Sequence, residues 1–359
     1  MDDRKTTGVS FLALTMGDAA GIGPEICAKV LAMKELWQDS RPLLIGDFAH
    51  MENAVQALPE ALRPVLLPVS VDAFTRLAAK GVLEEGGKTW TVLMMQPGAA
   101  LQGVVPGVLS SEAGRGAVEF VKAAVELAKA GLVSGIVTAP LNKAAIRAAG
   151  FSYPGHTELL AEGFGVKNYS LVLSAKGTFV FHATTHVSLR QALELIDRRR
   201  VYAQIRLAHL LADALGRGGE TIAVAALNPH AGEGGLFGRE EIEEIAPAVE
   251  AARAEGIPVE GPLPADVLFP RAAKGLYRFV VAMYHDQGHA VFKTLYFNEG
   301  INVTVGLPVI RTSVDHGTAF DIAGKGQANP DSLAEAIKLA GALGPKWAAI
   351  REAARLALE

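Results

Sequence analysis

Three histidines stand directly after apolar stretches, at points where a buried strand is expected to end. They are His186 in TTH, His230 in NPH and His285 in YHD, and Asp286 follows the last of them. Imidazole nitrogens bind zinc and other transition metals, and three of them with open coordination positions make a catalytic cation site. Each histidine taken alone could equally cap a loop through a hydrogen bond. The repeated location of the three favours a divalent cation site, although their spacing in the sequence proves nothing.

Other histidines lack this context. We interpret His50, His182 and His209 as ordinary structural or surface residues. His289 could supply a fourth ligand, since it follows His285 closely in the sequence. We interpret it instead as a loop histidine whose polar atoms are satisfied locally.

A second candidate site is the glycine-rich stretch SVDHGTAFDIAGKGQANP, residues 313–330. Glycines allow backbone N–H groups to approach a phosphate closely, and a carboxylate such as Asp321 can hold a ribose diol. The spacing is not the G-x-G-x-x-G of dinucleotide-binding folds. Composition alone therefore leaves two interpretations open, a cofactor loop and a plain surface loop.

The elements that must position these residues alternate between strand and helix. Such alternation predicts an α/β fold with largely parallel sheets, and ligands of these folds bind beyond the carboxyl ends of the strands. We expect a helix over residues 110–131, capped by Ser111 and ended by Gly131. The other main expectations are a helix from Pro24, a helix over Arg190–Leu215, strands at RFVVAMYHDQG (278–288) and INVTVGLPVI (301–310), and a helix over Ser332–Leu343.

Composition narrows the class of protein. The chain has 359 residues, of which 50% are hydrophobic and 20% charged, and its net charge is −4. This composition predicts a globular protein large enough for two lobes, and the lack of a basic stripe argues against a nucleic-acid partner. Cys27 is the single cysteine, which excludes a disulfide framework and favours a reducing cytoplasm. The apolar run near the N-terminus is too short for a signal sequence or a membrane span.

Two resemblances extend this interpretation. The 313–330 stretch resembles the NAD-binding loop of the β-decarboxylating dehydrogenases, the group of isocitrate and isopropylmalate dehydrogenase. The whole chain resembles the 4-hydroxythreonine-4-phosphate dehydrogenases of pyridoxal phosphate biosynthesis and their close paralogues. The stretches that carry it include AGFSYPGHTELLAE (149–162), LNPHAGEGG (227–235), AMYHDQG (282–288) and IRTSVDHGTAFDIAGKG (310–326).

The resemblance implies a role for individual residues. The family binds one divalent metal per active site and is a homodimer, with each metal site shared across the interface. The fold it implies is the two-lobed α/β/α arrangement of isopropylmalate dehydrogenase with the active site in the cleft, here residues 1–140 plus 305–359 as the first lobe and 141–304 as the second. The residues implied are His186, His230 and His285 for the metal, His156, Thr157, Lys293, Asn302 and Arg311 for the substrate, and His316, Gly317, Thr318, Asp321, Gly324, Lys325 and Asn329 for NAD.

The chemistry implied is oxidation of a hydroxyl β to the carboxylate of a phosphorylated four-carbon acid, followed by loss of CO2. Lys293, Asp266 and Asp286 are the candidates for the general base, and the sequence does not choose among them. Asp321 favours NAD over NADP. Three imidazoles do not distinguish zinc from magnesium, manganese, cobalt or nickel.

The substrate that the resemblance implies first is 4-hydroxy-L-threonine 4-phosphate, and the acids of a second, catabolic branch of the family are the alternative. The biosynthetic enzymes begin this region Pro-Gly-Glu-Pro-Ala-Gly, whereas this chain has MGDAAG, and its APLNK segment with Asn142 and Lys143 also differs from theirs. These forms resemble the catabolic paralogues that oxidise 4-phospho-D-threonate or 4-phospho-D-erythronate; other relatives act on cis-dihydrodiols of aromatic acids. Outside this family, three hypotheses remain: a metal-dependent hydrolase, an acyl- or phosphate-transferring relative, and a non-catalytic binding protein.

Overall fold

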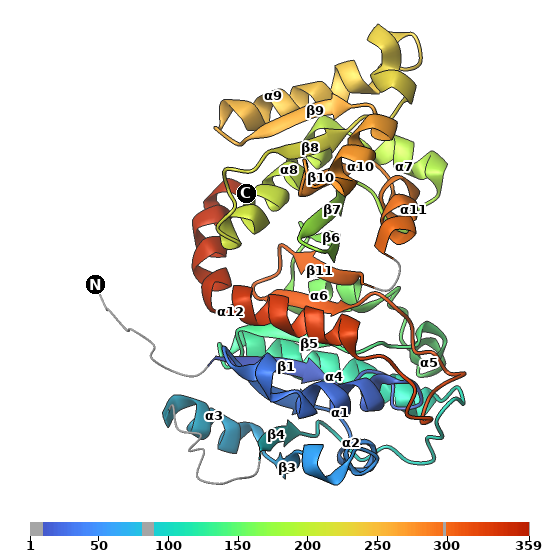
Figure 1. Cartoon of the computed structure of the whole chain (residues 1–359), viewed down its shortest axis with the longest axis vertical. Coiled ribbons are helices and arrows are strands. Elements are labelled where there is room, and N and C mark those ends of the chain that lie inside the picture. Colours follow the sequence, from blue (N-terminus) through green and yellow to red (C-terminus); the bar gives the residue numbers. More distant parts are fainter. Residues whose placement is uncertain (1–9, 81–89, 297–298, 359) are drawn as a thin grey trace. The chain divides into compact units, whose positions relative to one another are not determined.

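The computed structural model describes residues 10–80, 90–296 and 299–358. The chain divides into two compact units, each described separately below (Figure 1). Unit 1 comprises Met1–Val166 and Leu307–Pro345, and unit 2 comprises Lys167–Gly306 and Lys346–Glu359. The expected α/β fold class with largely parallel strands is confirmed.

Unit 1 is built on six strands in which every neighbouring pair runs parallel. Because the strands are parallel, their carboxyl ends lie at one edge, and Thr15, Thr138 and Ser313 are register partners there. In sheet order the strands are β3 (Val65–Pro68), β4 (Thr91–Met95), β2 (Arg41–Ile45), β1 (Phe11–Thr15), β5 (Gly135–Thr138) and β12 (Ile310–Val314).

Helices and short helical turns connect the strands of unit 1. The α4 helix packs on β1 and β5, and the first part of α12 packs on β12, where Thr312 Oγ1 donates to the Ala336 carbonyl at 2.8 Å. The helices are α1 (Gly23–Ala32), α2 (Phe48–Gln56), α3 (Val71–Lys80), α4 (Ser111–Lys129), α5 (Lys143–Ala148), α6 (His156–Phe164) and α12 (Asp331–Leu358), with 3-10 turns η1 (Lys34–Trp37) and η2 (Glu60–Leu62).

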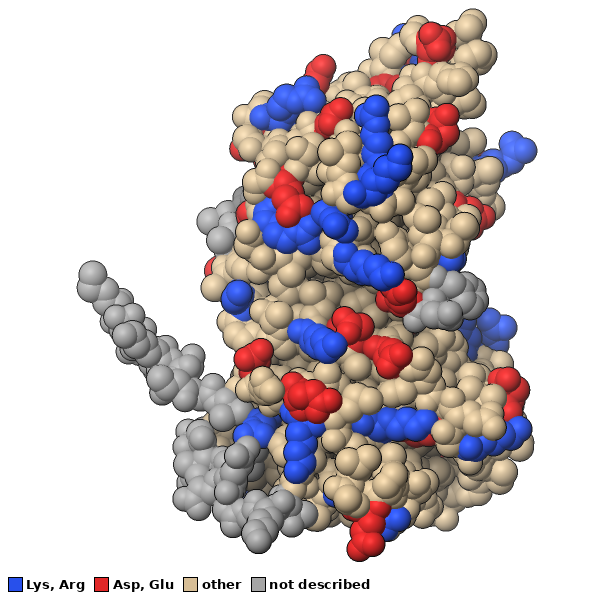
Figure 2. All heavy atoms as spheres, viewed as in Figure 1, with Lys and Arg blue, Asp and Glu red and all other residues tan. Residues whose placement is uncertain are grey.

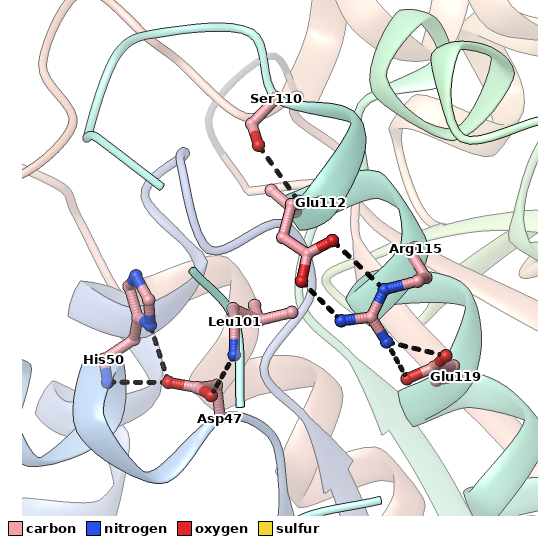
Figure 3. A network of polar contacts seen from close by, with 8 residues as sticks. Asp47, His50, Leu101, Ser110, Glu112, Arg115 and Glu119 are labelled. Atoms are coloured by element: carbon pink, nitrogen blue, oxygen red, sulfur yellow. Dashed lines mark hydrogen bonds and ion pairs between the residues drawn. The ribbon is translucent and has the colours of Figure 1, made fainter. Parts of the chain in front are cut away.

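The expected cap of α4 is off by one residue. Ser110, rather than Ser111, has the extended backbone of a cap, and its hydroxyl accepts a hydrogen bond from Ala113 N at 3.2 Å. On a half-buried face of this helix the Arg115 guanidinium bonds Glu112 and Glu119, as Figure 3 shows. In the same view Asp47 caps α2 and also accepts from Leu101 N at 2.9 Å, which fastens the segment before α4.

Unit 2 has a mixed sheet. Strand β6 pairs antiparallel with β11 and β7, whereas β7, β10, β8 and β9 are mutually parallel neighbours. The strands in sheet order are β11 (Ile301–Val305), β6 (Ser170–Ala175), β7 (Thr178–His182), β10 (Phe279–Ala282), β8 (Ile222–Ala225) and β9 (Val259–Leu263). The helices are α7 (Leu189–Leu195), α8 (Arg198–Ala214), α9 (Ala246–Ala254), α10 (Ala265–Ala273) and α11 (His285–Tyr296), with turns η3 (Pro229–Gly235) and η4 (Glu241–Ile245).

Three expected elements are divided differently in the structure. The strand expected over 278–288 ends at Ala282, so that His285 begins a helix. The strand expected over 301–310 is two strands, because Gly306 adopts a left-handed φ of 105° between them. The helix expected over 190–215 is interrupted at Asp197, whose carboxylate caps α8.

The unit boundary also differs from the lobes expected from the sequence. We expected residues 141–304 to form the second lobe, whereas residues 141–166 belong to unit 1. The reason is close helix packing, since α5 and α6 both pack against α4. At Gly114 on α4 the Ala145 carbonyl is so close that a Cβ atom would lie 2.2 Å from it.

The distribution of charged side chains on the surface agrees with the nearly balanced charge of the sequence. On the face shown in Figure 2, lysines and arginines are interspersed with acidic side chains, without a continuous basic stripe. None of the helices in the described parts of the chain combines the length and the apolar character needed to cross a membrane.

Candidate functional site

Arg311 is the most deeply buried of the predicted site residues. It lies on β12 with 2% of its surface exposed, and its Nη2 donates to Thr138 Oγ1 on the neighbouring strand at 2.6 Å. Burial lowers the pKa of Arg311 to about 9, while the charge of Glu158 acts in the opposite direction. A guanidinium held this way is a rigid, charged donor for an anionic group such as a carboxylate or phosphate.

His156 and Thr157 begin α6 and lie in the same unit as Arg311. Part of His156 reaches the surface, but its Nε2 is sealed from solvent and has no hydrogen-bond partner in the described part of the chain. Burial, and then the positive charge of Arg311, hold the pKa of His156 well below its usual value of 6.5. The structure therefore places a neutral imidazole, with a buried unsatisfied nitrogen, in the field of a buried cation. Both features suit an anionic ligand that also carries hydroxyl groups.

The predicted cofactor loop is fastened to the start of α1. Glu25 accepts hydrogen bonds from Gly326 N at 3.1 Å and from Ala328 N at 2.7 Å. Lys29, paired with Glu25 at 2.8 Å, donates to the carbonyls of the same two loop residues. Sequence reasoning missed this pair, although a Glu and a Lys four residues apart on a helix is a recognisable signal.

Most of the predicted cofactor residues are exposed. Gly324 has a left-handed φ of 73°, which glycine adopts without strain. Thr318 is buried, and its carbonyl accepts from Ile22 N at 3.0 Å, while Asn329 Oδ1 accepts from Asp331 N at the start of α12. Residues at the surface of the loop are His316, Gly317, Asp321, Gly324, Lys325 and Asn329. The backbone of the loop is thus fixed while its polar side chains are open to a ligand.

Asp18 is a buried acid that sequence reasoning did not assign. It is fully buried in the turn between β1 and α1, where Oδ1 accepts from Ala20 N at 2.8 Å, while Oδ2 has no hydrogen-bond partner among the residues that the structure describes. Burial raises the pKa of Asp18 to about 6. Its backbone N–H donates to the Pro140 carbonyl, and this approach requires Gly17, since a Cβ at residue 17 would lie 2.3 Å from that oxygen.

In unit 2, His186 and His285 are brought together. His186 follows β7 and His285 begins α11 after β10, and the parallel pairing of β7 with β10 places the two strand ends side by side. The two ring centroids are 5.8 Å apart. Nδ1 of His285 bonds Asp286 Oδ1 at 2.8 Å, and since a carboxylate only accepts, Nδ1 is the donor; in the neutral ring the lone pair is then on Nε2. Ionic or hydrogen-bonded support of this kind is typical of metal-binding histidines.

His230 does not join this pair. It lies exposed on the η3 turn, in which φ is between 44° and 77° from His230 to Gly234. Non-glycine residues rarely adopt this left-handed conformation, and such strain is concentrated at functional sites. The turn is preceded by a firm anchor, since Glu241 Oε1 accepts from the backbone N–H groups of Leu227 and Asn228. Within residues 10–80, 90–296 and 299–358, no three His, Cys, Asp or Glu side chains are arranged to hold a metal ion.

The remaining predicted residues are also in unit 2. Lys293 lies on α11, and its charge acts on His289 one turn earlier; Asn302 lies on β11, opposite Leu173 of β6. Asp266 and Asp286 line a mainly apolar cavity of about 530 Å³ between α10 and α11. The structure thus places Arg311, His156 and Thr157 in one unit and Lys293 and Asn302 in the other.

His182 and His289, which we interpreted as structural residues, lie next to the pair formed by His186 and His285. His182 and His289 have ring centroids 4.6 Å apart, and the ring of His289 stacks on that of His285 at 3.7 Å. Burial lowers the pKa of His182 to about 3 and that of His289 to about 4. The four-residue spacing of His285 and His289 would have been the signal, had a helix rather than a strand been expected there.

Comparisons with known proteins identify the family of the chain. The sequence model of the family described as pyridoxal phosphate biosynthetic protein PdxA matches residues 38–340. The D-threonate 4-phosphate dehydrogenase of Bordetella bronchiseptica is 52% identical, over 98% of each chain. The crystal structure of 4-hydroxythreonine-4-phosphate dehydrogenase from Klebsiella pneumoniae is 41% identical with a TM-score of 0.78, covering 94% of this chain and 99% of that one. A terephthalate 1,2-cis-dihydrodiol dehydrogenase from Burkholderia xenovorans is 31% identical with a TM-score of 0.65, covering 93% and 98%.

Proposed function

Since the chain belongs to the PdxA family of dehydrogenases, we propose that it is a metal-dependent, NAD-linked dehydrogenase that oxidises and decarboxylates D-threonate 4-phosphate. The observation that carries the choice of substrate is the 52% identity to a D-threonate 4-phosphate dehydrogenase over nearly the whole of both chains. The alternative is 4-hydroxy-L-threonine 4-phosphate, the substrate in the name of a structure that is 41% identical. The aromatic dihydrodiol reaction belongs to a more distant relative, at 31% identity.

The geometry of unit 1 supports an anionic substrate. The buried guanidinium of Arg311 is a fixed donor for the carboxylate or the phosphate, and Thr138 holds its orientation. His156, kept neutral by burial and by Arg311, offers a nitrogen that has no hydrogen-bond partner among the described residues. We assign substrate binding to Arg311, His156 and Thr157 in unit 1 and to Lys293 and Asn302 in unit 2.

Two histidines of unit 2, His186 and His285, offer nitrogen donors to a divalent cation. The bond from Nδ1 to Asp286 leaves Nε2 of His285 as the nitrogen that can bind a cation, and His186 lies beside it. We propose that His186, His230 and His285 are the ligands, with one of them coming from a second copy of the chain in a homodimer. When bound, the cation supplies Lewis acidity, which lowers the pKa of an alcohol and stabilises negative charge on oxygen.

The loop over residues 313–330 is proposed as the NAD site, with Asp321 on the ribose diol. Its backbone is held by hydrogen bonds to the side chains of Glu25 and Lys29. When bound there, NAD would supply the hydride acceptor. The proton of the substrate hydroxyl must go to a protein base, for which Lys293, Asp266 and Asp286 are the candidates. We place the reaction in the cytoplasm, where NAD and phosphorylated acids are available.

The test is NADH formation by the purified protein with a divalent cation. D-threonate 4-phosphate should be oxidised with a kcat/KM at least about 100-fold above that for 4-hydroxy-L-threonine 4-phosphate, since an amino group replaces a hydroxyl at a site built for the latter. The reverse preference would make the chain a biosynthetic enzyme. Turnover of neither acid, with NAD still bound, would refute the proposed substrate and leave the cofactor assignment standing.

A further inference from the structure

The hydrogen-bond chain that ends at His289 has no part in the proposed chemistry. It starts at the Leu171 carbonyl on β6, passes through His182 on β7 and reaches His289 on α11. His182 is 3% exposed, so this chain runs inside the unit rather than across its surface. The ring of His289 then lies flat on the ring of His285, with 10° between their planes.

The acceptor at the start of the chain fixes the proton on every ring that follows. A backbone carbonyl only accepts, so Nδ1 of His182 carries the proton in its 3.4 Å contact with Leu171. A neutral His182 then has its lone pair on Nε2, which accepts from Nδ1 of His289 at 3.1 Å. The proton of His289 is therefore on Nδ1, and its Nε2 keeps a lone pair. This is the same tautomer that Asp286 imposes on His285.

The hydrogen-bonded histidines also support His285 on the face of its ring, which Asp286 does not contact. The side chain of Asp286 is 83% exposed, so its contact with His285 competes with water. The stacked ring of His289 restricts rotation of His285 from its other side, and His289 is itself anchored through buried His182. A ring held on its edge by Asp286 and on its face by His289 retains one orientation before any metal arrives.

Gly288 leaves the space that the hydrogen bonds from Leu171 through His182 to His289 require. A Cβ atom at position 288 would lie 2.3 Å from Nε2 of His182 and 3.0 Å from a methyl group of Val180. Any side chain there would displace the His182 ring from the line between Leu171 and His289. The glycine is therefore required by the close approach of α11 to β7, and not by its backbone conformation.

We propose that His182 and His289 are positioning residues that set the tautomer and the ring plane of His285 for metal binding. This inference rests on the proposed function only in that His285 is a metal ligand. Neither residue needs to touch the metal or the substrate. The effect of losing them is expected in metal affinity, in the range of 10- to 100-fold that residues behind metal ligands typically show.

The experiment is a titration of the full-length protein with Co2+, followed by visible absorption and calorimetry rather than by turnover. His289→Leu and His182→Leu should each weaken Co2+ binding about tenfold or more. His182→Gln should stay within about threefold of the wild type, because its amide can donate to Leu171 and accept from His289. His209→Leu is the matched control, since His209 lies on α8 and pairs with Asp213 instead.

The outcomes separate the inference from the proposed function. If the wild type does not bind Co2+, the metal site itself is wrong. If it binds and folded His289→Leu binds equally well, the positioning role is overturned. Because His289 is partly exposed, this variant is expected to fold even if His182→Leu does not. Equal losses in folded His182→Gln and His182→Leu would refute the fixed tautomers, whereas recovery by Gln supports them.

Discussion

The arginine site of unit 1 and the histidine site of unit 2 are built in opposite ways. Arg311 is enclosed by its own chain, with a hydrogen bond to Thr138 and the charge of Glu158 nearby. His285 is partly exposed, its partner Asp286 is almost fully exposed, and His230 lies on a separate exposed turn. An enclosed charge binds an anion strongly by itself, whereas open donors form a site only when further groups approach. We therefore attribute substrate anchoring to unit 1 and expect a second copy to complete the site of unit 2.

Replacing Arg311 tests the enclosed site and should have the largest effect. Arg311→Met should lower kcat/KM at least about 100-fold, equivalent to roughly 3 kcal/mol, because a buried charged donor is lost. Steady-state kinetics with D-threonate 4-phosphate measures it. Arg76→Met on exposed α3 is the control and should leave kcat/KM unchanged. If Arg311→Met lowers kcat/KM less than about fivefold, Arg311 does not anchor the substrate, and the contrast between the enclosed site of unit 1 and the open site of unit 2 is wrong.

Asp18 tests whether a buried carboxylate in unit 1 lowers the free energy of unfolding. Its pKa in the folded protein is about 6, above its usual value of 3.8, so the folded state binds the proton more tightly. The free energy of unfolding should thus fall as pH rises from about 4 to about 6 and stay low above that. Asp18→Asn removes this dependence.

The measurement is urea unfolding of both proteins at about pH 4 and about pH 8. Relative to the wild type, the Asp18→Asn variant should gain about 2 kcal/mol between the two conditions, from a shift of roughly two pKa units discounted for relaxation. Asp72→Asn, at an exposed position of α3, provides the control. An identical difference between variant and wild type at both pH values would show that Asp18 is not destabilised by burial.

Asp286 tests the open site. Asp286→Asn should weaken Co2+ binding about tenfold, because an amide cannot fix the proton on His285 Nδ1 as a carboxylate does. Asp266→Asn is a matched control, since Asp266 lines the same cavity from α10. Turnover of both variants also tests the general base. If metal affinity is unchanged in Asp286→Asn, the His285–Asp286 pair has no role in the metal site.

Glu25 should show the smallest effect. Glu25→Gln weakens two hydrogen bonds to the 313–330 loop and its pairing with Lys29, and NAD binding should become about fivefold weaker, by roughly 1 kcal/mol. Quenching of protein fluorescence by NADH measures the affinity. Glu335→Gln, which removes an exposed pair with Lys338 on α12, should change nothing. Unaltered NADH affinity in Glu25→Gln would mean that the loop does not depend on α1.

The sequence carried the family and the fold class, because alternating apolar strands and amphipathic helices with long shared motifs are local signals. The sequence did not predict where each strand ends and the next helix begins. The apolar run before His285 continues without a breaker into α11, so a strand was expected where a helix begins, and the pairing of His285 with His289 was invisible. Likewise His182 lies inside an apolar strand, and only the register of β7 with β10 brings it to α11. The 301–310 segment shows the same limit, since only a backbone angle at Gly306 separates its two strands.

The most direct measurement is the stoichiometry of NADH and CO2 released from D-threonate 4-phosphate by the metal-loaded protein. The proposed reaction predicts one NADH and one CO2 per substrate consumed, with loss of both after chelation and recovery of both on adding Co2+. Release of neither product from a folded, metal-loaded protein that consumes the substrate, or NADH formation that is unaffected by chelation, would contradict the account.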